Sequence, residues 1–351
     1  MIGMKEKLQA FIENAGWPRI IIGLFLLSLF IAAPMVGVRL DASLSDTLVR
    51  VGMNGVLVLA MVPMVQSGCG LNFGLPLGII AGLLGAVTSI QIGIQGSIGF
   101  LLAMVIAVPL AVVFGWMYGQ LLNRVKGDEM MIATYVGFSS VALMCMAWLL
   151  LPYTSPTMIW GYGGSGLRTT ISVEGFWFNA LSKHLNIRIG EFFYLPIGMY
   201  IFFALMIFLV WGFFRTKTGT AVTAVGSNPE FARASGIDVD KMRTISVILS
   251  TVLGAVGILV YEQSFGFVQL YMGPFYMAFP AVAAILLGGA SVNKASMVNV
   301  VVGTFLFQGI LTMTPSVINS VMQTDMSEVI RIIVSNGMIL YALTRKVMVK
   351  R

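Results

Sequence analysis

The polar side chains that could do chemistry in this chain are neutral and lie within or beside long apolar segments. They are amides and a hydroxyl: Asn54, Gln66, Asn72, Thr134, Gln308 and Asn336. Amides and hydroxyls donate and accept hydrogen bonds, so they suit a neutral, hydrogen-bonding solute better than an ion. Each of them could equally bridge two helices inside a bundle, and the sequence leaves both interpretations open.

No arrangement typical of an enzyme accompanies these amides. The only histidine, His184, lies beside Lys183 in a polar connection, and the two cysteines, Cys69 and Cys145, are too isolated to form a metal site. The chain has no Gly-rich loop ending in Lys-Ser or Lys-Thr, which would cradle the phosphates of ATP. No carboxylate pair in the apolar segments suggests a proton relay. We therefore expect no enzyme activity, no metal and no bound cofactor.

The elements that position these residues must be membrane helices. Of the 351 residues, 58% are hydrophobic and only 10% are charged, and the mean hydropathy is +0.93. A soluble domain carries about 25% charged residues. At ~20 residues for each membrane span, residues 1–351 form one transmembrane domain without a nucleotide-hydrolysing module. The net charge of +7 is explained by the positive-inside rule, so we expect contact with lipid and not with nucleic acid.

Ten hydrophobic segments predict an all-α polytopic membrane protein with about ten transmembrane helices. The third, eighth and ninth segments are short or rich in glycine, which makes them candidates for broken or re-entrant helices. The first apolar run has no small-residue cleavage site, so we do not expect it to be a removed signal peptide. The ten segments are 18–38, 47–65, 73–91, 98–122, 130–151, 192–214, 243–262, 274–290, 295–313 and 326–344.

The distribution of charge predicts the orientation of the chain. Lys and Arg gather at both termini and in the connections at 124–126, 215–243 and 294. With ten spans, all of these fall on one side, which the positive-inside rule assigns to the cytoplasm. Asp41, Asp46 and Glu262 fall on the other side, with Arg39 and Arg50 as exceptions. Both termini and residues 219–239 are therefore expected in the cytoplasm, and 152–191 is expected as an extracytoplasmic loop.

Two stretches in different halves of the chain resemble each other. Gly70–Gly78 (GLNFGLPLG) and Gly273–Pro280 (GPFYMAFP) both place Gly and Pro just before a short apolar helix. Such interruptions at matching places in two related halves commonly mark a transporter's substrate site, although glycine could simply allow close helix packing. Aromatic residues beside the breaks could stack on a sugar face or a base. We predict a substrate path lined by Asn54, Gln66, Asn72, Phe73 and Tyr276.

The polar segment Gly219–Val239 interrupts the apolar sequence. Gly219 and Gly226 are predicted to mark turns. Asn228 is expected to cap a helix that has Pro229 at its first position and Glu230 in its first turn. Gly236 is expected to end this helix, and the apolar Ile237 follows it. The pattern predicts a surface helix of about two turns that enters a groove on a partner, or alternatively an ordinary interfacial helix.

The residues Val225–Val239 (VGSNPEFARASGIDV) closely resemble the cytoplasmic coupling helix of ABC importer permeases. The resemblance is to the group that serves ribose, simple sugars, nucleosides and branched-chain amino acids. Ser67–Gly78 (SGCGLNFGLPLG) is similar to that group's GGIDLSVG-type element, and Ala281–Ser291 (AVAAILLGGAS) to its AIAAVVLGGTS-type element. The resemblance covers roughly residues 45–345.

This resemblance implies a permease subunit in the bacterial inner membrane, working by alternating access as a dimer of identical or homologous permeases. Two separate ATPase subunits would bind ATP, and an extracytoplasmic binding protein would deliver the solute. The residues that would contact the ATPase are Gly226, Asn228, Glu230, Ala232, Ala234, Ser235, Gly236 and Ile237.

The solute follows less directly from the resemblance. Asn72 and Phe73 stand where the group usually has Asp and Ser, whereas Gly127–Thr134 (GDEMMIAT) resembles nucleoside-type permeases. A simple sugar or a nucleoside is the main expectation. The alternatives are a branched-chain amino acid, a signalling sugar derivative, or a secondary transporter that works without ATPases.

Overall fold

The computed structural model describes residues 17–161, 164, 166–183, 185–322 and 327–348. Seven helices in these ranges are long and apolar enough to cross a membrane. They are α3 (Leu40–Leu59) continued by α4 (Met61–Gln66), α5 (Leu75–Ile92), α6 (Gly96–Arg124), α7 (Glu129–Leu150), α8 (Ile197–Arg215), α11 (Val239–Phe265) and α13 (Met297–Met322).

Three further apolar helices complete the expected set of ten. They are α2 (Trp17–Met35), α12 (Gly273–Leu287) and α14 (Ser327–Met348). Each of the ten predicted segments therefore corresponds to a helix. The prediction of an all-α polytopic membrane protein is confirmed.

The structure corrects several predicted boundaries. The second segment begins at Leu40 and not at residue 47, and the sixth begins only at Ile197 because Phe193–Leu195 form a strand. The ninth segment is not short, since α13 is a continuous helix of 26 residues. The eighth is short, as predicted: α12 has 15 residues. At 1.5 Å per residue it is about 22 Å long, less than the ~30 Å hydrocarbon core of a bilayer.

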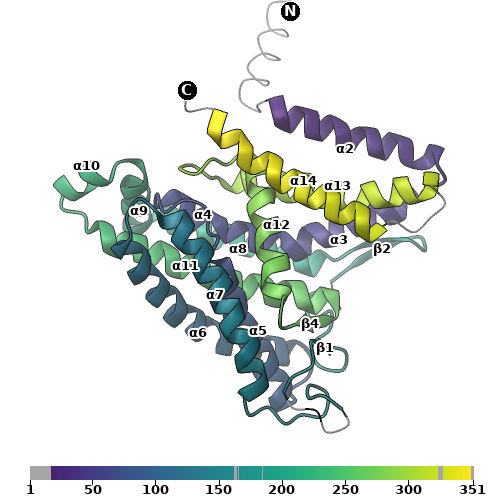
Figure 1. Cartoon of the computed structure of the whole chain (residues 1–351). Helices are drawn as coiled ribbons and strands as arrows, with labels where there is room; N and C mark the ends of the chain where they lie inside the picture. Colours follow the sequence, from purple (N-terminus) through teal and green to yellow (C-terminus); the bar gives the residue numbers. More distant parts are fainter. Residues whose placement is uncertain (1–16, 162–163, 165, 184, 323–326, 349–351) are drawn as a thin grey trace, which may run out of the picture.

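The helices form two groups joined by α3 and α12 (Figure 1). In one group α11 packs against α5 and α6, and α7 covers α5; in the other, α13 packs against α2 and α14. Two glycines of α5 allow the close approach of α11: a Cβ on Gly78 would lie 2.5 Å from the Thr251 carbonyl oxygen, and one on Gly82 would lie 2.6 Å from that of Ala255. At these two positions glycine serves helix packing.

Two short antiparallel ribbons were not predicted from the sequence. β1 (Thr170–Ser172) pairs with β4 (Phe267–Gln269), and β2 (Ile187–Ile189) pairs with β3 (Phe193–Leu195). Strands of three residues are too short to show a period-2 pattern. The β1–β4 ribbon joins the long connection after α7 to the end of α11, and it lies at the opposite end of that helix from α9 and α10 (Figure 1).

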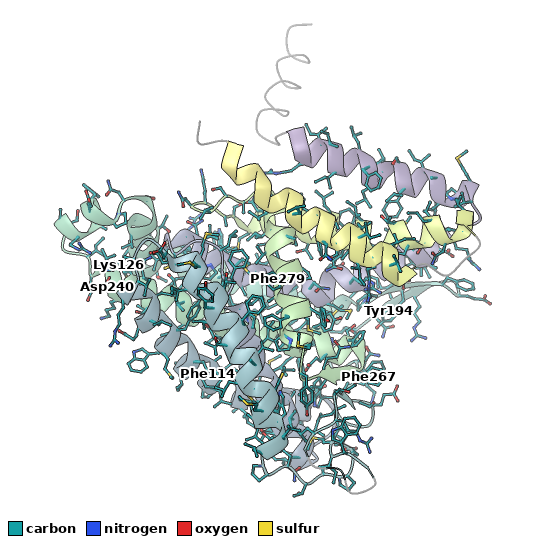
Figure 2. All side chains as sticks on the ribbon, viewed as in Figure 1. Phe114, Lys126, Tyr194, Asp240, Phe267 and Phe279 are labelled. Atoms are coloured by element: carbon teal, nitrogen blue, oxygen red, sulfur yellow. The ribbon has the colours of Figure 1, made fainter. Side chains whose placement is uncertain are left out.

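Connections that the charge pattern assigned to one face of the membrane lie together in space. Lys126 follows α6 and forms an ion pair of 2.6 Å with Asp240 at the start of α11. Figure 2 labels both residues. At the other end of these helices, the Gly96 amide donates to the Phe176 carbonyl oxygen. This agrees with the predicted topology, while the side of the membrane on which each end lies stays a prediction.

Candidate functional site

A short capped helix stands at one edge of the molecule, between α9 (Lys217–Ser227) and α11 (Figure 1). This helix, α10 (Pro229–Ala234), begins as predicted: the Asn228 side-chain oxygen accepts a hydrogen bond of 2.9 Å from the Phe231 amide. It also ends as predicted, at Gly236, whose φ of +82° is readily adopted only by glycine. The Ile237 amide then donates to the Ala232 carbonyl oxygen.

The prediction that Gly219 and Gly226 mark turns is wrong, because both lie inside α9. A Cβ on Gly219 would lie 2.0 Å from the Phe213 carbonyl oxygen, and one on Gly226 would lie 2.1 Å from the Gln66 carbonyl oxygen. These glycines therefore permit close backbone contact. A glycine selected for contact and one selected for a turn look the same in a sequence.

The residues predicted to contact an ATPase divide into an exposed set and an internal set. Ala232 is fully buried, together with Val225 of α9 and Val239 of α11, so it fastens α10 to its own chain. Gly226 is occupied by its contact with Gln66, and Ile237 is half-buried. The remaining predicted residues are exposed: Asn228, Glu230, Ala234, Ser235 and Gly236. Their contact with a partner stays a prediction.

Three exposed residues of α10 were absent from the predicted contact set: Pro229, Phe231 and Arg233. Phe231 is 66% exposed, and Arg233 is exposed as well. An exposed aromatic side chain among small and charged residues is suited to be the apolar centre of a contact with a partner. The signal was available in the sequence, since Phe231 is the only large apolar residue of this helix.

The connection Ser67–Gly74 between α4 and α5, named here the break loop, is almost wholly buried. Gly68 and Gly70 have φ values of +77° and +80°, a conformation that costs other residues free energy. Asn72 is 0% exposed. Apart from the exposed Gly68, the loop therefore runs through the protein interior, where irregular backbone is tolerated in a membrane protein because neighbouring protein groups, and not lipid, surround its polar atoms.

Hydrogen bonds hold Asn72 in place. Its amide nitrogen donates to the Ser250 hydroxyl of α11 at 2.7 Å, and that hydroxyl donates to the Ala60 carbonyl oxygen at 2.5 Å. The Tyr118 hydroxyl of α6 donates to the Asn72 side-chain oxygen at 3.3 Å. Both ends of the amide are thus occupied by the chain itself, and Asn72 can meet a solute only if these contacts change.

Phe73 belongs to a row of aromatic rings between α7 and α12. Its ring centroid lies 6.2 Å from that of Phe279, which Figure 2 shows on α12. Phe275 lies 6.4 Å from Phe279 and 4.7 Å from Phe138 of α7. The far end of this row borders a cavity of about 360 Å3 lined by Phe138, Ser139, Val141, Ala142, Cys145, Met272 and Phe275.

The other predicted path residues are dispersed. The Gln66 amide nitrogen donates to the Ala295 carbonyl oxygen. Ala295 lies in the connection between α12 and α13. Asn54 is half-buried on α3 and donates to the Arg50 carbonyl oxygen at 2.9 Å. Tyr276 is 71% exposed on α12. The structure therefore brings Gln66, Asn72 and Phe73 together at the break loop and leaves the other two apart.

Charged and titratable groups near these elements are few. Arg243 of α11 is buried and forms an ion pair with Glu129 at the start of α7. Glu262, which the charge pattern assigned to the extracytoplasmic side, lies inside α11 and is fully buried. Burial raises the pKa of the Tyr271 hydroxyl, which stays protonated and donates to the Leu167 carbonyl oxygen.

Among the described residues, no three His, Cys, Asp or Glu side chains gather as a metal site would require. His184 lies outside the described residues.

Comparison with known families decides between the classes of protein that such an arrangement allows. The family described as "Branched-chain amino acid transport system / permease component" matches residues 43–342. The chain belongs to this family. The match takes in the break loop, the capped helix α10 and nearly all of the apolar helices.

Individual relatives match this permease over shorter stretches than the family does. It is 31% identical over 123 residues to the Autoinducer 2 import system permease protein of Enterobacter sp. (strain 638), covering 35% of each chain. It is 35% identical over 92 residues to the Nucleoside ABC transporter permease protein of Lactococcus lactis subsp. cremoris (strain MG1363), covering 26% of this chain and 29% of the relative. It is 26% identical over 194 residues to the Autoinducer 2 import system permease protein of Shigella flexneri, covering 54% of each.

The permease thus spans between about a third and about half of the length of these relatives. No solved structure matches the chain.

Proposed function

We propose that this permease is the membrane-spanning subunit of an ATP-driven ABC importer for a small polar solute, either a simple sugar or a nucleoside. The observation that carries the proposal is the pairing of an exposed capped helix with a buried loop. α10 presents Phe231 outward, and α9, which leads into it, touches the break loop through Gly226. A force on α10 therefore has a short route to the irregular segment inside the membrane domain.

ATP binding and hydrolysis are assigned to separate ATPase subunits. Residues 219–239 are cytoplasmic in this proposal, and α10 enters a groove on an ATPase with Phe231 as its central apolar contact. The permease itself binds no cofactor. Closure of the ATPases moves α10, and the membrane helices then open the path on one side or the other.

Three features support a neutral, ring-shaped solute. The predicted path residues Asn54, Gln66 and Asn72 carry neutral amides, which pair with hydroxyls or bases. The aromatic row ends at a cavity beside Phe275 and Phe138, where a base or a sugar face can stack. Relatives are named for import of autoinducer 2 and for nucleosides. The family description names branched-chain amino acids, which remain the alternative solute.

The proposed assembly contains two permeases, identical or homologous, two ATPases and an extracytoplasmic solute-binding protein. It lies in the bacterial inner membrane with both permease termini in the cytoplasm. Residues 152–191, with the β1 strand, face the binding protein. The path lies between helices that alternate between an outward-open and an inward-open arrangement.

The test is purification of the permease from its native membrane after substitution of one exposed aromatic residue. The parent is expected to retain an ATPase, and Phe231→Asp is expected to lose it. Phe192→Asp is the matched control, because Phe192 is also an exposed phenylalanine but lies by the β2–β3 ribbon, far from α10 (Figure 1). If no ATPase accompanies the parent, the importer assignment is wrong and a secondary transporter becomes the better explanation.

The solute is tested by uptake of tritiated ribose, uridine and leucine into cells that carry or lack the permease. Loss of ribose or uridine uptake in cells without the permease supports the proposal. Loss of leucine uptake alone would favour the amino-acid alternative.

A further inference from the structure

The break loop is held by contacts from separate parts of the chain. Gly68 lies against α9, where a Cβ added to it would be 3.1 Å from the Gly226 Cα. Gly70 lies against Met130 at the start of α7 and Val292 after α12, whose side chains would be 3.1 and 3.3 Å from a Cβ added to Gly70. Because the contact between Gly68 and Gly226 is made by backbone on both sides, no flexible side chain absorbs a movement of α9 before it reaches the loop.

A buried ion pair contacts the loop from another direction. Arg243 of α11 is only 7% exposed. Its guanidinium pairs with Glu129 and, through Nε, donates to the Cys69 sulfur at 3.2 Å. A buried ion pair contributes little net stability, since the cost of removing two charges from water offsets their attraction. The planar donors of arginine do fix the relative positions of both partners. The main effect of this pair is therefore to fix the relative positions of α11, α7 and Cys69, and not to stabilise the fold.

One helix contacts the break loop at two places. Ser250 follows Arg243 by seven residues on α11, so both project from the same face of the helix, about 10.5 Å apart. Arg243 contacts Cys69 near the start of the loop, and Ser250 contacts Asn72 near its end. A shift of α11 therefore moves the whole loop and not a single residue of it.

The helix that contacts the loop is also joined to α10. Val225, Ala232 and Val239 belong to α9, α10 and α11 and form one buried cluster. The Asp238 side chain accepts a hydrogen bond from the Lys241 amide and so caps α11 directly after α10. The end of α9, all of α10 and the start of α11 consequently form one packed unit.

We propose that Arg243 and Glu129 are positioning residues that transmit a displacement of α10 to the break loop. When the unit formed by α9, α10 and α11 moves, the ion pair carries Cys69 with it. The amide of Asn72 and the ring of Phe73 then change their surroundings at the end of the same loop. The inference rests on the proposed function, because it needs an ATPase to move α10.

The test uses a thiol that already lies in the loop. The chain has two cysteines, so Cys145→Ser leaves Cys69 as the only thiol of the permease. The measured quantity is the rate at which N-ethylmaleimide modifies Cys69 in the purified permease–ATPase complex, followed by mass spectrometry of its peptide. We expect this rate to differ roughly tenfold between the nucleotide-free and the vanadate-trapped complex, the size typical of coupling between distant sites.

The decisive variant combines Glu129→Leu with Arg243→Met. Replacing both charges with apolar side chains of similar size is often neutral for stability, so the melting temperature and ATP hydrolysis should persist. The ratio of the two modification rates should fall clearly below that of the parent, because Cys69 loses its contact with Arg243 while the contacts of Ser250 and Gly226 with the loop remain. If the double variant does not fold, Arg243→Lys provides the comparison, because it keeps a cation beside Glu129 but lacks the Nε donor to Cys69.

A second ion pair between the same two regions provides the control. Lys126 and Asp240 also join the connection before α7 to the start of α11, but their pair is exposed and does not contact the break loop. Lys126→Met should therefore keep the ratio of the parent. The comparison of ratios also removes any direct effect of Arg243 on the reactivity of the thiol.

The outcomes separate two failures. If no ATPase accompanies the parent complex, the proposed function is wrong and the positioning role falls with it. If the parent complex hydrolyses ATP but its Cys69 ratio is one, the break loop does not respond and only the positioning role is wrong. A double variant that folds and keeps the ratio of the parent would overturn the positioning role as well.

Discussion

The contact between Gly226 and the break loop gives the sharpest prediction, because one methyl group suffices to test it. In Gly226→Ala the new Cβ would lie 2.1 Å from the Gln66 carbonyl oxygen and 3.0 Å from the Gly68 amide nitrogen. Ordinary contact begins at 3.4 Å, so α9 and the loop would have to separate by about 1.3 Å, the difference between the two distances. Both partner atoms belong to the backbone, so no side chain can rotate away.

The expected cost follows from two opposing effects. Overpacking of this kind costs about 1–3 kcal/mol, whereas alanine is favoured over glycine inside a helix by about 1 kcal/mol. The difference is a loss of about 0–2 kcal/mol. We expect a value near its upper end, since the clash involves backbone that can relax only by moving the two elements apart. Gly212→Ala in α8 is the matched control, because no atom lies within 4 Å of its new Cβ.

The measurement is the melting temperature of the purified permease at one fixed heating rate, together with uptake by cells of the tritiated solute that the parent transports. Gly226→Ala should melt a few degrees lower than the parent and should lose uptake. Gly212→Ala should match or exceed the parent in stability and keep uptake. Equal melting temperatures and equal uptake for the two variants would show that α9 and the loop are not in tight contact.

Three further predictions concern the capped helix, the buried network and the cavity. Asn228→Ala should cost the end of α10 about 1 kcal/mol and speed hydrogen–deuterium exchange at the Phe231 amide, whereas Asn228→Asp should preserve protection. Ser250→Ala removes hydrogen bonds to two buried polar groups in other parts of the chain, so it should lower the melting temperature by more than Ser246→Ala, whose hydroxyl donates only to its own helix. Equal effects would contradict the network. Phe275→Ala should raise the KM for uridine uptake about tenfold if the base stacks on this ring, and an unchanged KM would remove the ring from the path.

The membrane helices and the caps could be predicted from the sequence because their causes are local. A span needs an apolar run of about 20 residues, and all ten runs became helices. The caps of α10 depend on residues a few positions apart, such as Asn228 and the amide of Phe231. Hydropathy and capping chemistry therefore report on a single stretch of chain without knowledge of the rest.

The contacts around the break loop could not be predicted because their partners are distant in sequence. Arg243 meets Cys69 across 174 positions, and Asn72 meets Ser250 across 178. Gly226 was interpreted as a turn because glycine is common in turns. Its actual role is close contact with the Gln66 carbonyl oxygen, a partner that no local pattern shows. Glu262 ends the seventh predicted segment and was counted with the charges of the extracytoplasmic side, yet it lies inside α11 and is fully buried.

The position of α11 constrains how the two ends of the permease can move. This helix has 27 residues and is therefore about 40 Å long. Near its start it is packed with α10, and near its end the Gln263 carbonyl oxygen accepts a hydrogen bond of 2.8 Å from the Asn179 amide, while the Gly266 carbonyl oxygen accepts one from Val173. Because the helix is continuous between these points, a tilt that displaces its start, beside α10, must also displace its end, beside the β1–β4 ribbon. Opening one end while closing the other then needs no second signal across the membrane, since both follow from the orientation of one helix.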